Sequence, residues 1–134
     1  MKSGWQVLST RNAVLWKPSS AKAPYVGSGY YHDDNGGKGT RSARYRAKLE
    51  PGRYEVRLSY SPEANRATHV PVTVHHRGGE KTLIINQRKR PPIDGATISL
   101  GIFTFGESGT VQVSNKGTDG YVILDAAQFL PVSK

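Results

Sequence analysis

Apolar and polar residues alternate with a period of two over most of this chain. A first clear run covers residues 42–49, and a second covers residues 54–60. In a β-strand this alternation sends one set of side chains into a core and the other set into water. Since the strong turn signal Pro51-Gly52 lies between the two runs, they predict an antiparallel hairpin.

Shorter runs of the same kind continue to the end of the sequence. Further strands are predicted at residues 5–8, 14–16, 70–75, from 83 onward, at 98–105 with a kink at Gly101, and at 111–114, 121–124 and 126–130. No stretch has the apolar stripe of a helix. About eight short strands joined by turns predict an all-β fold, a single antiparallel β-sandwich of jelly-roll type covering residues 1–134.

Three stretches interrupt the alternation, at residues 18–35, 61–69 and 86–95. They are polar, and each is longer than a tight hairpin needs. Long loops on a rigid sandwich are where binding residues concentrate. We therefore look for function in these three segments.

The composition limits the class of protein. A sequence of 134 residues with 36% hydrophobic residues suits one domain with a modest core. It has no run of about 18 apolar residues for a membrane span, and no apolar segment after Met1 for a secretion signal. We interpret it as one module of a longer protein. The lack of cysteine excludes disulfides, zinc–cysteine sites and a thiol nucleophile.

The formal net charge of +9 changes the expected partner and leaves the fold unaffected. It favours an anionic partner, such as an acidic polysaccharide, a nucleic acid or an anionic surface. The alternative is a basic, soluble domain with no specific anion site.

Several motifs, taken in order, resemble those of a known family. They are Val26-Gly27-Ser28-Gly29-Tyr30, Gly37-Lys38-Gly39-Thr40-Arg41-Ser42, Pro51-Gly52-Arg53-Tyr54-Glu55-Val56, Asn65-Arg66-Ala67-Thr68 before Val70-Pro71-Val72, Asn86-Gln87, Leu100-Gly101 before Phe103-Thr104-Phe105, and Asp125-Ala126 before Gln128-Phe129-Leu130-Pro131. The ordered set covers nearly the whole sequence. It is similar to the golvesin C-terminal-like domain, which is also found at the end of xanthan lyases.

This resemblance implies a β-sandwich similar to carbohydrate-binding modules, appended to larger exported bacterial proteins such as polysaccharide lyases. The implied partners are a polysaccharide and the domains of a parent enzyme, and the implied location is extracellular or periplasmic. Two positions depart from the family pattern. Thr97 stands where an aromatic residue is expected, and His69 stands where an asparagine is expected.

The first candidate ligand-binding residues are Tyr30, Tyr31, His32 and Asp33, followed by Asp34-Asn35. Sugar recognition uses flat rings against the C–H faces of a pyranose and planar polar groups for pairs of hydroxyls. In the alternative interpretation the tyrosines pack beneath the loop and the Asp-Asn cluster forms turns. The consecutive acids do not match a calcium loop. We therefore predict no metal ligand here and no cofactor, while a structural Ca²⁺ held by backbone carbonyls elsewhere stays open.

The second candidate is Asn65 with Arg66. A guanidinium has a rigid fork of donors that fits a carboxylate, such as that of a uronic acid or a pyruvylated sugar. The alternative is that Arg66 staples the loop to backbone carbonyls or to the acids of the first segment. The sequence does not separate the two.

The third candidate is Asn86, Gln87 and Arg88, followed by Lys89-Arg90, the densest basic run of the sequence. No aromatic residue lies close to it in sequence, so nucleic acid is not the expected partner. A charge run of this kind is typical of a solvated loop. Otherwise it joins Arg66 in binding an acidic polymer.

A fourth set of charges lies on predicted strands. Arg44, Arg46 and Lys48 alternate along one strand, and Arg57 follows on the next with Glu55 expected among them. We interpret this as an ordinary solvated face with a modest added attraction for polyanions.

Enzyme chemistry has little support in the sequence. His75 and His76 point to opposite faces of a strand, so they cannot easily bind one metal ion. There is no nucleophile elbow, phosphate-binding glycine loop or zinc motif. We predict no catalytic residue.

The sequence thus predicts a non-catalytic carbohydrate-binding module that holds its parent enzyme on a polysaccharide, with the charge favouring an acidic one. The alternative is a structural module that packs on its parent protein or mediates cell-surface assembly. A third interpretation is a general attraction of the +9 charge for any polyanion, which salt would weaken.

Overall fold

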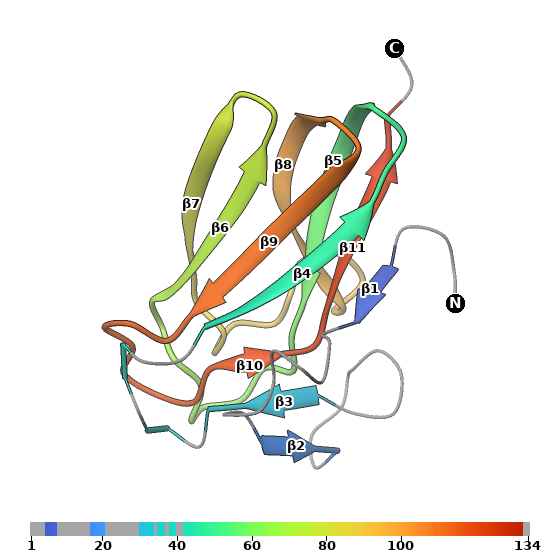
Figure 1. Cartoon of the computed structure of the whole chain (residues 1–134). Coiled ribbons are helices and arrows are strands. Elements are labelled where there is room, and N and C mark those ends of the chain that lie inside the picture. The colour runs from blue at the N-terminus through green and yellow to red at the C-terminus, as the bar shows by residue number, and fades with distance from the viewer. Residues whose placement is uncertain are drawn as a thin grey trace.

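Two antiparallel β-sheets pack face to face in the computed structural model, which describes residues 5–7, 17–20, 30–33, 35–36, 38–39 and 42–132 (Figure 1). In spatial order, the first sheet contains β1 (Trp5–Val7), β11 (Ala126–Pro131), β5 (Gly52–Ser59) and β8 (Thr97–Phe105). The second contains β4 (Ser42–Lys48), β9 (Ser108–Ser114), β6 (Val70–His76) and β7 (Gly79–Ile85).

The connections between these eight strands follow a jelly roll. Of these eight strands, the first along the sequence (β1) lies beside the last (β11) in one sheet. The second (β4) lies beside the seventh (β9) in the other sheet. This is the double Greek-key arrangement of a two-sheet jelly roll. The predicted fold class, an all-β antiparallel sandwich of about eight strands, is confirmed.

The core lies between the two sheets and follows the alternation of the sequence. In β4 the burial alternates at every residue, with Ala43, Tyr45 and Ala47 inside. At one end the core contains edge-to-face aromatic rings, with Phe105 5.9 Å from Tyr54 and 5.5 Å from Phe129 between centroids. A core of interlocking buried side chains makes the sandwich a rigid support for its loops.

The predicted hairpin of residues 42–49 and 54–60 is wrong, although both strands exist. Strand β4 pairs with β9, whereas β5 pairs with β11 and β8 in the other sheet. The turn at Pro51-Gly52 therefore leads from one sheet to the other. The Tyr54 hydroxyl fixes this arch by donating to the Glu50 carbonyl (2.7 Å). Alternation cannot tell an arch from a hairpin, because both bury the same faces.

The predicted kink at Gly101 is confirmed as a β-bulge. Val56 pairs with Gly101, but the next residue, Arg57, pairs with Ser99, so Leu100 is the extra residue of β8. Gly101 has a φ of 120°, which L side chains rarely adopt. A glycine is therefore required where the strand bends.

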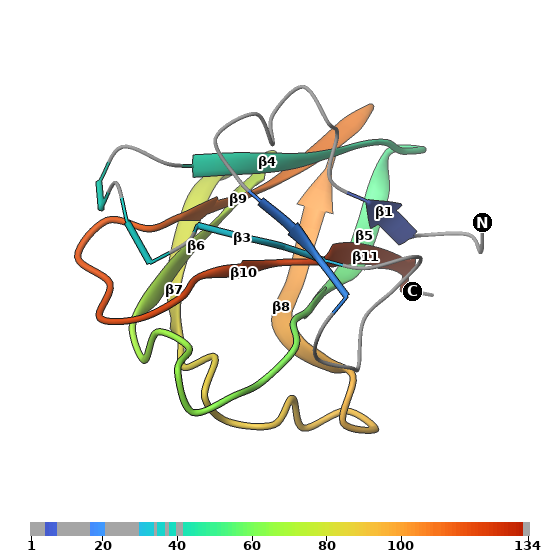
Figure 2. The same ribbon diagram turned by 90° about the horizontal axis from the view of Figure 1, so that it is seen from below.

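A third, small sheet lies across one end of the sandwich, as Figures 1 and 2 both show. Its strands are β10 (Ile123–Leu124), β3 (Tyr30–His32) and β2 (Lys17–Ser19). Residues 30–32, expected in a loop, thus form a strand, and the strand expected at 121–124 shortens to β10. The strand expected at 14–16 lies outside the described residues. Within the part of the sequence that is described, no helix has the length and apolar character needed to cross a membrane.

Candidate functional site

Main-chain hydrogen bonds join the polar segments of the sequence beside the small sheet. Gln87 donates its N–H to the Ala67 carbonyl, Ala67 donates to the Tyr121 carbonyl, and Tyr121 donates to the Asn65 carbonyl, each at 2.9 Å. We call residues 30–33, 65–68, 86–88 and 119–123 the loop junction. It brings together the nine predicted binding residues: Tyr30, Tyr31, His32, Asp33, Asn65, Arg66, Asn86, Gln87 and Arg88.

Arg66 lies inside the junction, and its side chain is bound to groups of the protein. The residue is 5% exposed. Its Nε donates to the Ser61 carbonyl (2.8 Å), Nη1 to Asn65 Oδ1 (2.9 Å) and Nη2 to the Tyr30 hydroxyl (3.2 Å). The guanidinium carbon lies 5.5 Å from the centroid of the Tyr30 ring, and Tyr30 is itself only 4% exposed. The geometry gives Arg66 and Tyr30 the role of a loop staple.

Asp33 is the charged centre of the junction and is fully buried. Its Oδ1 accepts the N–H groups of Asn35 and Val122, both at 3.0 Å. Its Oδ2 accepts Lys38 Nζ (2.8 Å) and Asn115 Nδ2 (3.0 Å). Burial raises the pKa of Asp33, but these hydrogen bonds more than offset it, and the pKa lies below its ordinary value. Asp33 is thus held as a carboxylate by the protein.

Gln87 is also fully buried, and its side chain pairs with the main chain of Ile123. Gln87 Oε1 accepts the Ile123 N–H (2.8 Å), and Nε2 donates to the Ile123 carbonyl (3.0 Å). Strand β10, which contains Ile123, is the edge of the small sheet. Because a side-chain amide has the donor and the acceptor of a peptide group, Gln87 takes the place of a neighbouring strand.

Hydrogen bonds from buried groups hold the segment after Gln87, while the Arg88 side chain faces outward. Asn86 Oδ1 accepts the Arg88 N–H (3.0 Å) in a turn. The Tyr60 hydroxyl donates to the Lys89 carbonyl (2.6 Å), and burial raises the pKa of Tyr60 to about 12. Arg88 Nε donates to the Arg66 carbonyl (2.6 Å), yet the Arg88 side chain is 42% exposed. Its guanidinium is thus both anchored and accessible.

Asp119 belongs to the junction, but no motif in the sequence marks it as a site residue, because it lies in the polar turn of residues 115–120. Thr68 donates its N–H to one Asp119 carboxylate oxygen and its hydroxyl to the other, both at 2.7 Å. These bonds lower the pKa of Asp119 to about 2. The Arg88 Nη2 lies 3.8 Å from Asp119 Oδ2. The charge of Arg88 is therefore partly balanced.

Tyr121 is the second residue that the sequence analysis missed. Its half-buried ring meets the ring of His32 edge to face, with centroids 5.5 Å apart. Tyr31 is half-buried as well, and Asn65 is exposed. Two rings beside an amide and a guanidinium form the set that sugar recognition uses. The sequence signal for this residue is an aromatic side chain directly after a polar turn, and the alternation of the sequence predicts only a strand there.

The sequence profile of the golvesin C-terminal domain family matches residues 7–131. This chain belongs to that family. Its golvesin C-terminal domain is 37% identical to a xanthan lyase of Bacillus sp. (strain GL1) in an alignment of 123 residues that covers 87% of this chain and 13% of the lyase. The structure of a Paenibacillus xanthan lyase is 32% identical and superposes with a TM-score of 0.83, covering 99% of this chain and 12% of that lyase.

Carbohydrate-binding modules share the fold of this golvesin C-terminal domain at low sequence identity. A family 35 carbohydrate binding module from an environmental isolate is 15% identical, with a TM-score of 0.59, and the match covers 99% of this chain and 96% of that module. The resemblance inferred from the ordered motifs is confirmed. The golvesin C-terminal domain spans only 13% and 12% of the two xanthan lyases.

Thr97, where an aromatic residue was expected, does not lie on an exposed surface of this golvesin C-terminal domain. It is buried at the start of β8 and pairs with Ser59 of β5. An aromatic ring at this position of the strand would not be presented as a flat platform without moving its neighbours.

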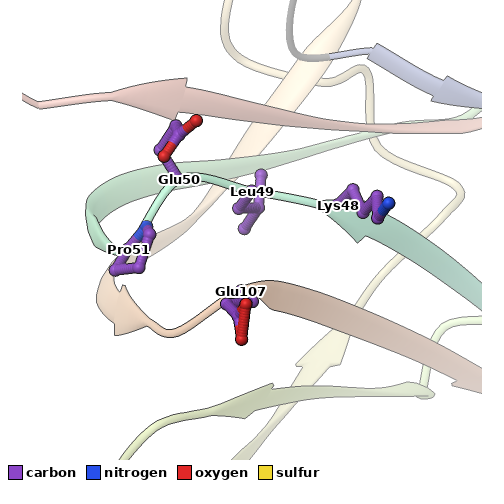
Figure 3. Close-up of a pocket in the computed structure, with 5 residues that line it drawn as sticks. All are labelled: Lys48, Leu49, Glu50, Pro51 and Glu107. Carbon is purple, nitrogen blue, oxygen red and sulfur yellow. The ribbon is translucent and has the colours of Figure 1, made fainter.

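Shallow depressions of the golvesin C-terminal domain lie at the other end of the sandwich. One, of about 500 Å³, is lined by Lys48, Leu49, Glu50, Pro51 and Glu107. Figure 3 shows the Glu50 and Glu107 side chains pointing away from each other, so they do not form a carboxylate pair there.

Among the described residues, no three His, Asp or Glu side chains are grouped as metal ligands. The absence of a cofactor stays a prediction.

Close backbone contact at Gly120 sets a first prediction for the loop junction. A Cβ atom at Gly120 would lie 2.7 Å from the carbonyl carbon and oxygen of Arg66 and from the carbonyl oxygen of Asn65. We expect Gly120→Ala to lower the free energy of unfolding by about 1–3 kcal/mol, because the main chain at Gly120 and at Asn65-Arg66 must move apart to fit the added methyl group. Thermal unfolding followed by circular dichroism measures this effect.

Gly52→Ala is the matched control, since a Cβ at Gly52 meets no atom within 4 Å. We expect its unfolding free energy to stay within about 0.5 kcal/mol of the unchanged protein. Equal melting temperatures for the two variants would contradict the close approach at Gly120.

Proposed function

We propose that this protein is a non-catalytic carbohydrate-binding module that holds a larger parent protein on a polysaccharide, with acidic polysaccharides as the preferred class. The observation that carries the proposal is the outward surface of the loop junction. There the rings of Tyr121 and His32 are in contact, and the Tyr121 N–H binds the carbonyl of the exposed Asn65. The exposed Arg88 donates to the carbonyl of the next residue, Arg66. Rings can cover the C–H face of a sugar, while the amide and guanidinium bind hydroxyls or a carboxylate.

The buried frame beneath this surface supports a binding role. Asp33, Arg66 and Gln87 hold the three segments by hydrogen bonds, so the outward groups need little ordering when a ligand arrives. A few such contacts give weak binding, with a dissociation constant from millimolar to micromolar, about −4 to −8 kcal/mol. Linkage to a parent protein with its own site would raise the avidity.

The relatives support the same proposal. The fold is that of a carbohydrate binding module, and the two relatives of higher identity are xanthan lyases, of which this domain spans a small part. We propose accordingly that this module is a non-catalytic part of an exported polysaccharide-acting enzyme, located outside the cell or in the periplasm. The net charge of +9 favours acidic polysaccharides over neutral ones.

Affinity electrophoresis of the protein in gels containing xanthan, polygalacturonate or neutral mannan tests the proposal. We expect retention by the acidic polysaccharides, and a loss of about tenfold or more in affinity for Arg88→Ala, because the accessible guanidinium is removed. Lys89→Ala is the matched control. It removes the same charge at the next exposed position, and we expect less than about a twofold change.

Two results would speak against this function. Retention by none of the polysaccharides would favour the alternative, a structural module that packs on its parent protein or mediates cell-surface assembly. An equal loss for Arg88→Ala and Lys89→Ala, with DNA bound as tightly as the glycans, would reduce the interaction to general attraction of a basic protein for polyanions.

A further inference from the structure

The outer face of the sheet formed by β4, β9, β6 and β7 carries a row of three cations along its β4 edge. Strand β4 exposes Arg44, Arg46 and Lys48 at alternate positions. The three strands β4, β9 and β6 contain no aspartate or glutamate. Beside the cations these strands present polar side chains without a carboxylate, including Thr110, Gln112, Thr73 and His75.

Glu55, the acid that the sequence placed among these cations, lies on the other sheet. Because β5 belongs to the other sheet, Glu55 and Arg57 are on the opposite side of the sandwich, where they pair with each other at 3.0 Å. On β7, at the far edge of the outer face, Glu80 lies 3.2 Å from His75 Nδ1. The residues of β9 in register with the β4 cations are Gln112, Thr110 and Ser108, and beyond the end of β4 Glu50 and Glu107 line a depression together with Lys48.

Strand register arranges the polar groups of this face in rows. Arg44 faces Gln112, which faces Thr73, and Arg46 faces Thr110, which faces His75. Alternate residues of a strand are about 7 Å apart, so the three cations span about 14 Å along β4. His75 Nε2 lies 3.1 Å from Gln112 Oε1, which ties neighbouring strands together on the surface. The result is a flat, ordered surface with a line of cations along one edge.

We propose that this surface, the β4 face (Arg44, Arg46, Lys48, Thr110, Gln112, Thr73 and His75), binds an extended acidic polysaccharide. The inference rests on the proposed function and names the surface and the ligand class for it. Carboxylates of the glycan lie along the β4 cations, and the sugar hydroxyls lie over the hydroxyl and amide side chains of β9 and β6.

Two features favour a polysaccharide over a nucleic acid on this surface. The described outer faces of β4, β9 and β6 present no Phe, Tyr or Trp on which bases could stack. Next to them, Ile84 is 58% exposed and paired in register with Pro71. This apolar strip suits the C–H face of a sugar ring.

The loop junction presents one exposed guanidinium, that of Arg88, whereas the β4 face presents a row of cations. Arg88 Nη2 lies 3.8 Å from Asp119 Oδ2, so the charge of this guanidinium is partly balanced within the junction. The junction therefore suits recognition of a sugar unit, and the β4 face suits recognition of repeated carboxylates. The two surfaces contribute separately and can be tested separately.

Cations on β4 also have an ordinary structural explanation, because β4 is the edge strand of its sheet. Charges on an edge strand deter pairing with another protein molecule. That role would show as self-association when the charges are removed, with no selective change in glycan affinity. Sizing of the variants by light scattering separates this explanation from ligand binding.

The experiment compares two triple variants with the same loss of charge. Arg44→Gln/Arg46→Gln/Lys48→Gln neutralises the β4 face. The matched control neutralises three exposed cations that lie off this face: Arg53→Gln/Lys89→Gln/Lys116→Gln. Affinities for polygalacturonate, xanthan, neutral mannan and duplex DNA are measured between about 50 and 200 mM salt.

We expect the β4-face variant to lose about tenfold or more in affinity for both acidic polysaccharides and to show a shallower salt dependence, with mannan affinity unchanged. The control should lose less than about threefold. Equal losses in the two triple variants, or DNA bound better than the glycans, would overturn the inference. So would an unchanged β4-face variant in a protein whose binding still depends on Arg88, and in that case the proposed function stands. If the native protein binds no polysaccharide, both the inference about the β4 face and the proposed function are wrong.

Discussion

Asp33→Asn is expected to lower the free energy of unfolding by about 3–5 kcal/mol at neutral pH. The wild-type carboxylate is fully buried and accepts hydrogen bonds from Val122, Asn35, Lys38 and Asn115. An asparagine has one acceptor oxygen in place of two, and its NH₂ group would face donors. Urea unfolding followed by tryptophan fluorescence and by circular dichroism measures the loss.

The same residue sets a dependence on pH. The pKa of Asp33 in the folded protein lies below its ordinary value of 3.8. A carboxyl group of this kind contributes stability that is present above the unfolded pKa and is lost as the pH falls through the folded pKa. We therefore expect the native protein to lose stability below about pH 4, and the Asp33→Asn variant to show a weaker dependence there.

Asp94→Asn is the control for both measurements, because it makes the same chemical change at an exposed position. We expect it to change the unfolding free energy by less than about 0.5 kcal/mol. If Asp33→Asn behaves like Asp94→Asn, the carboxylate does not hold the junction together.

Gln87→Leu is the second change with a large expected effect. It leaves the buried N–H and C=O of Ile123 without the partners that the glutamine amide supplies at 2.8 and 3.0 Å. Each unsatisfied main-chain group costs about 1–3 kcal/mol, so we expect a loss of about 2–6 kcal/mol. The variant should also expose the edge of β10, which amide hydrogen exchange at Ile123 would detect.

Gln128→Leu, on the half-buried outer side of β11, provides the comparison. It removes an amide that does not replace a strand, and we expect it to stay within about 1 kcal/mol of the native protein. A Gln87→Leu variant as stable as Gln128→Leu, with Ile123 still protected, would mean that β10 finds another partner.

Binding at the loop junction is tested best at its exposed residues. Asp33, Arg66 and Gln87 belong to its frame, so changing them disturbs the fold and any ligand together. Asn65 and Arg88 are exposed, and substitutions there report on binding more directly. A study that changed only the most buried of the predicted site residues would confuse the two effects.

Local patterns in the sequence were enough to locate the strands and to say which of their faces point inward. Alternation is a property of the extended backbone, so β4, β5, β6 and β9 could be located without knowledge of their neighbours. The bend at Gly101 was predictable for the same local reason. The ordered motifs identified the family, because they cover nearly the whole sequence.

Which strands share a sheet, and which polar residues remain available to a ligand, emerged only from the folded molecule. Residues 42–49 and 54–60 have the same pattern whether they pair or face each other across the core. Arg66 became a staple because it meets Tyr30, 36 residues away, and Gln87 became a substitute strand because it meets Ile123, also 36 residues away. Burial and hydrogen-bond partners arise from contacts between distant segments, and a pattern within one segment carries no record of them.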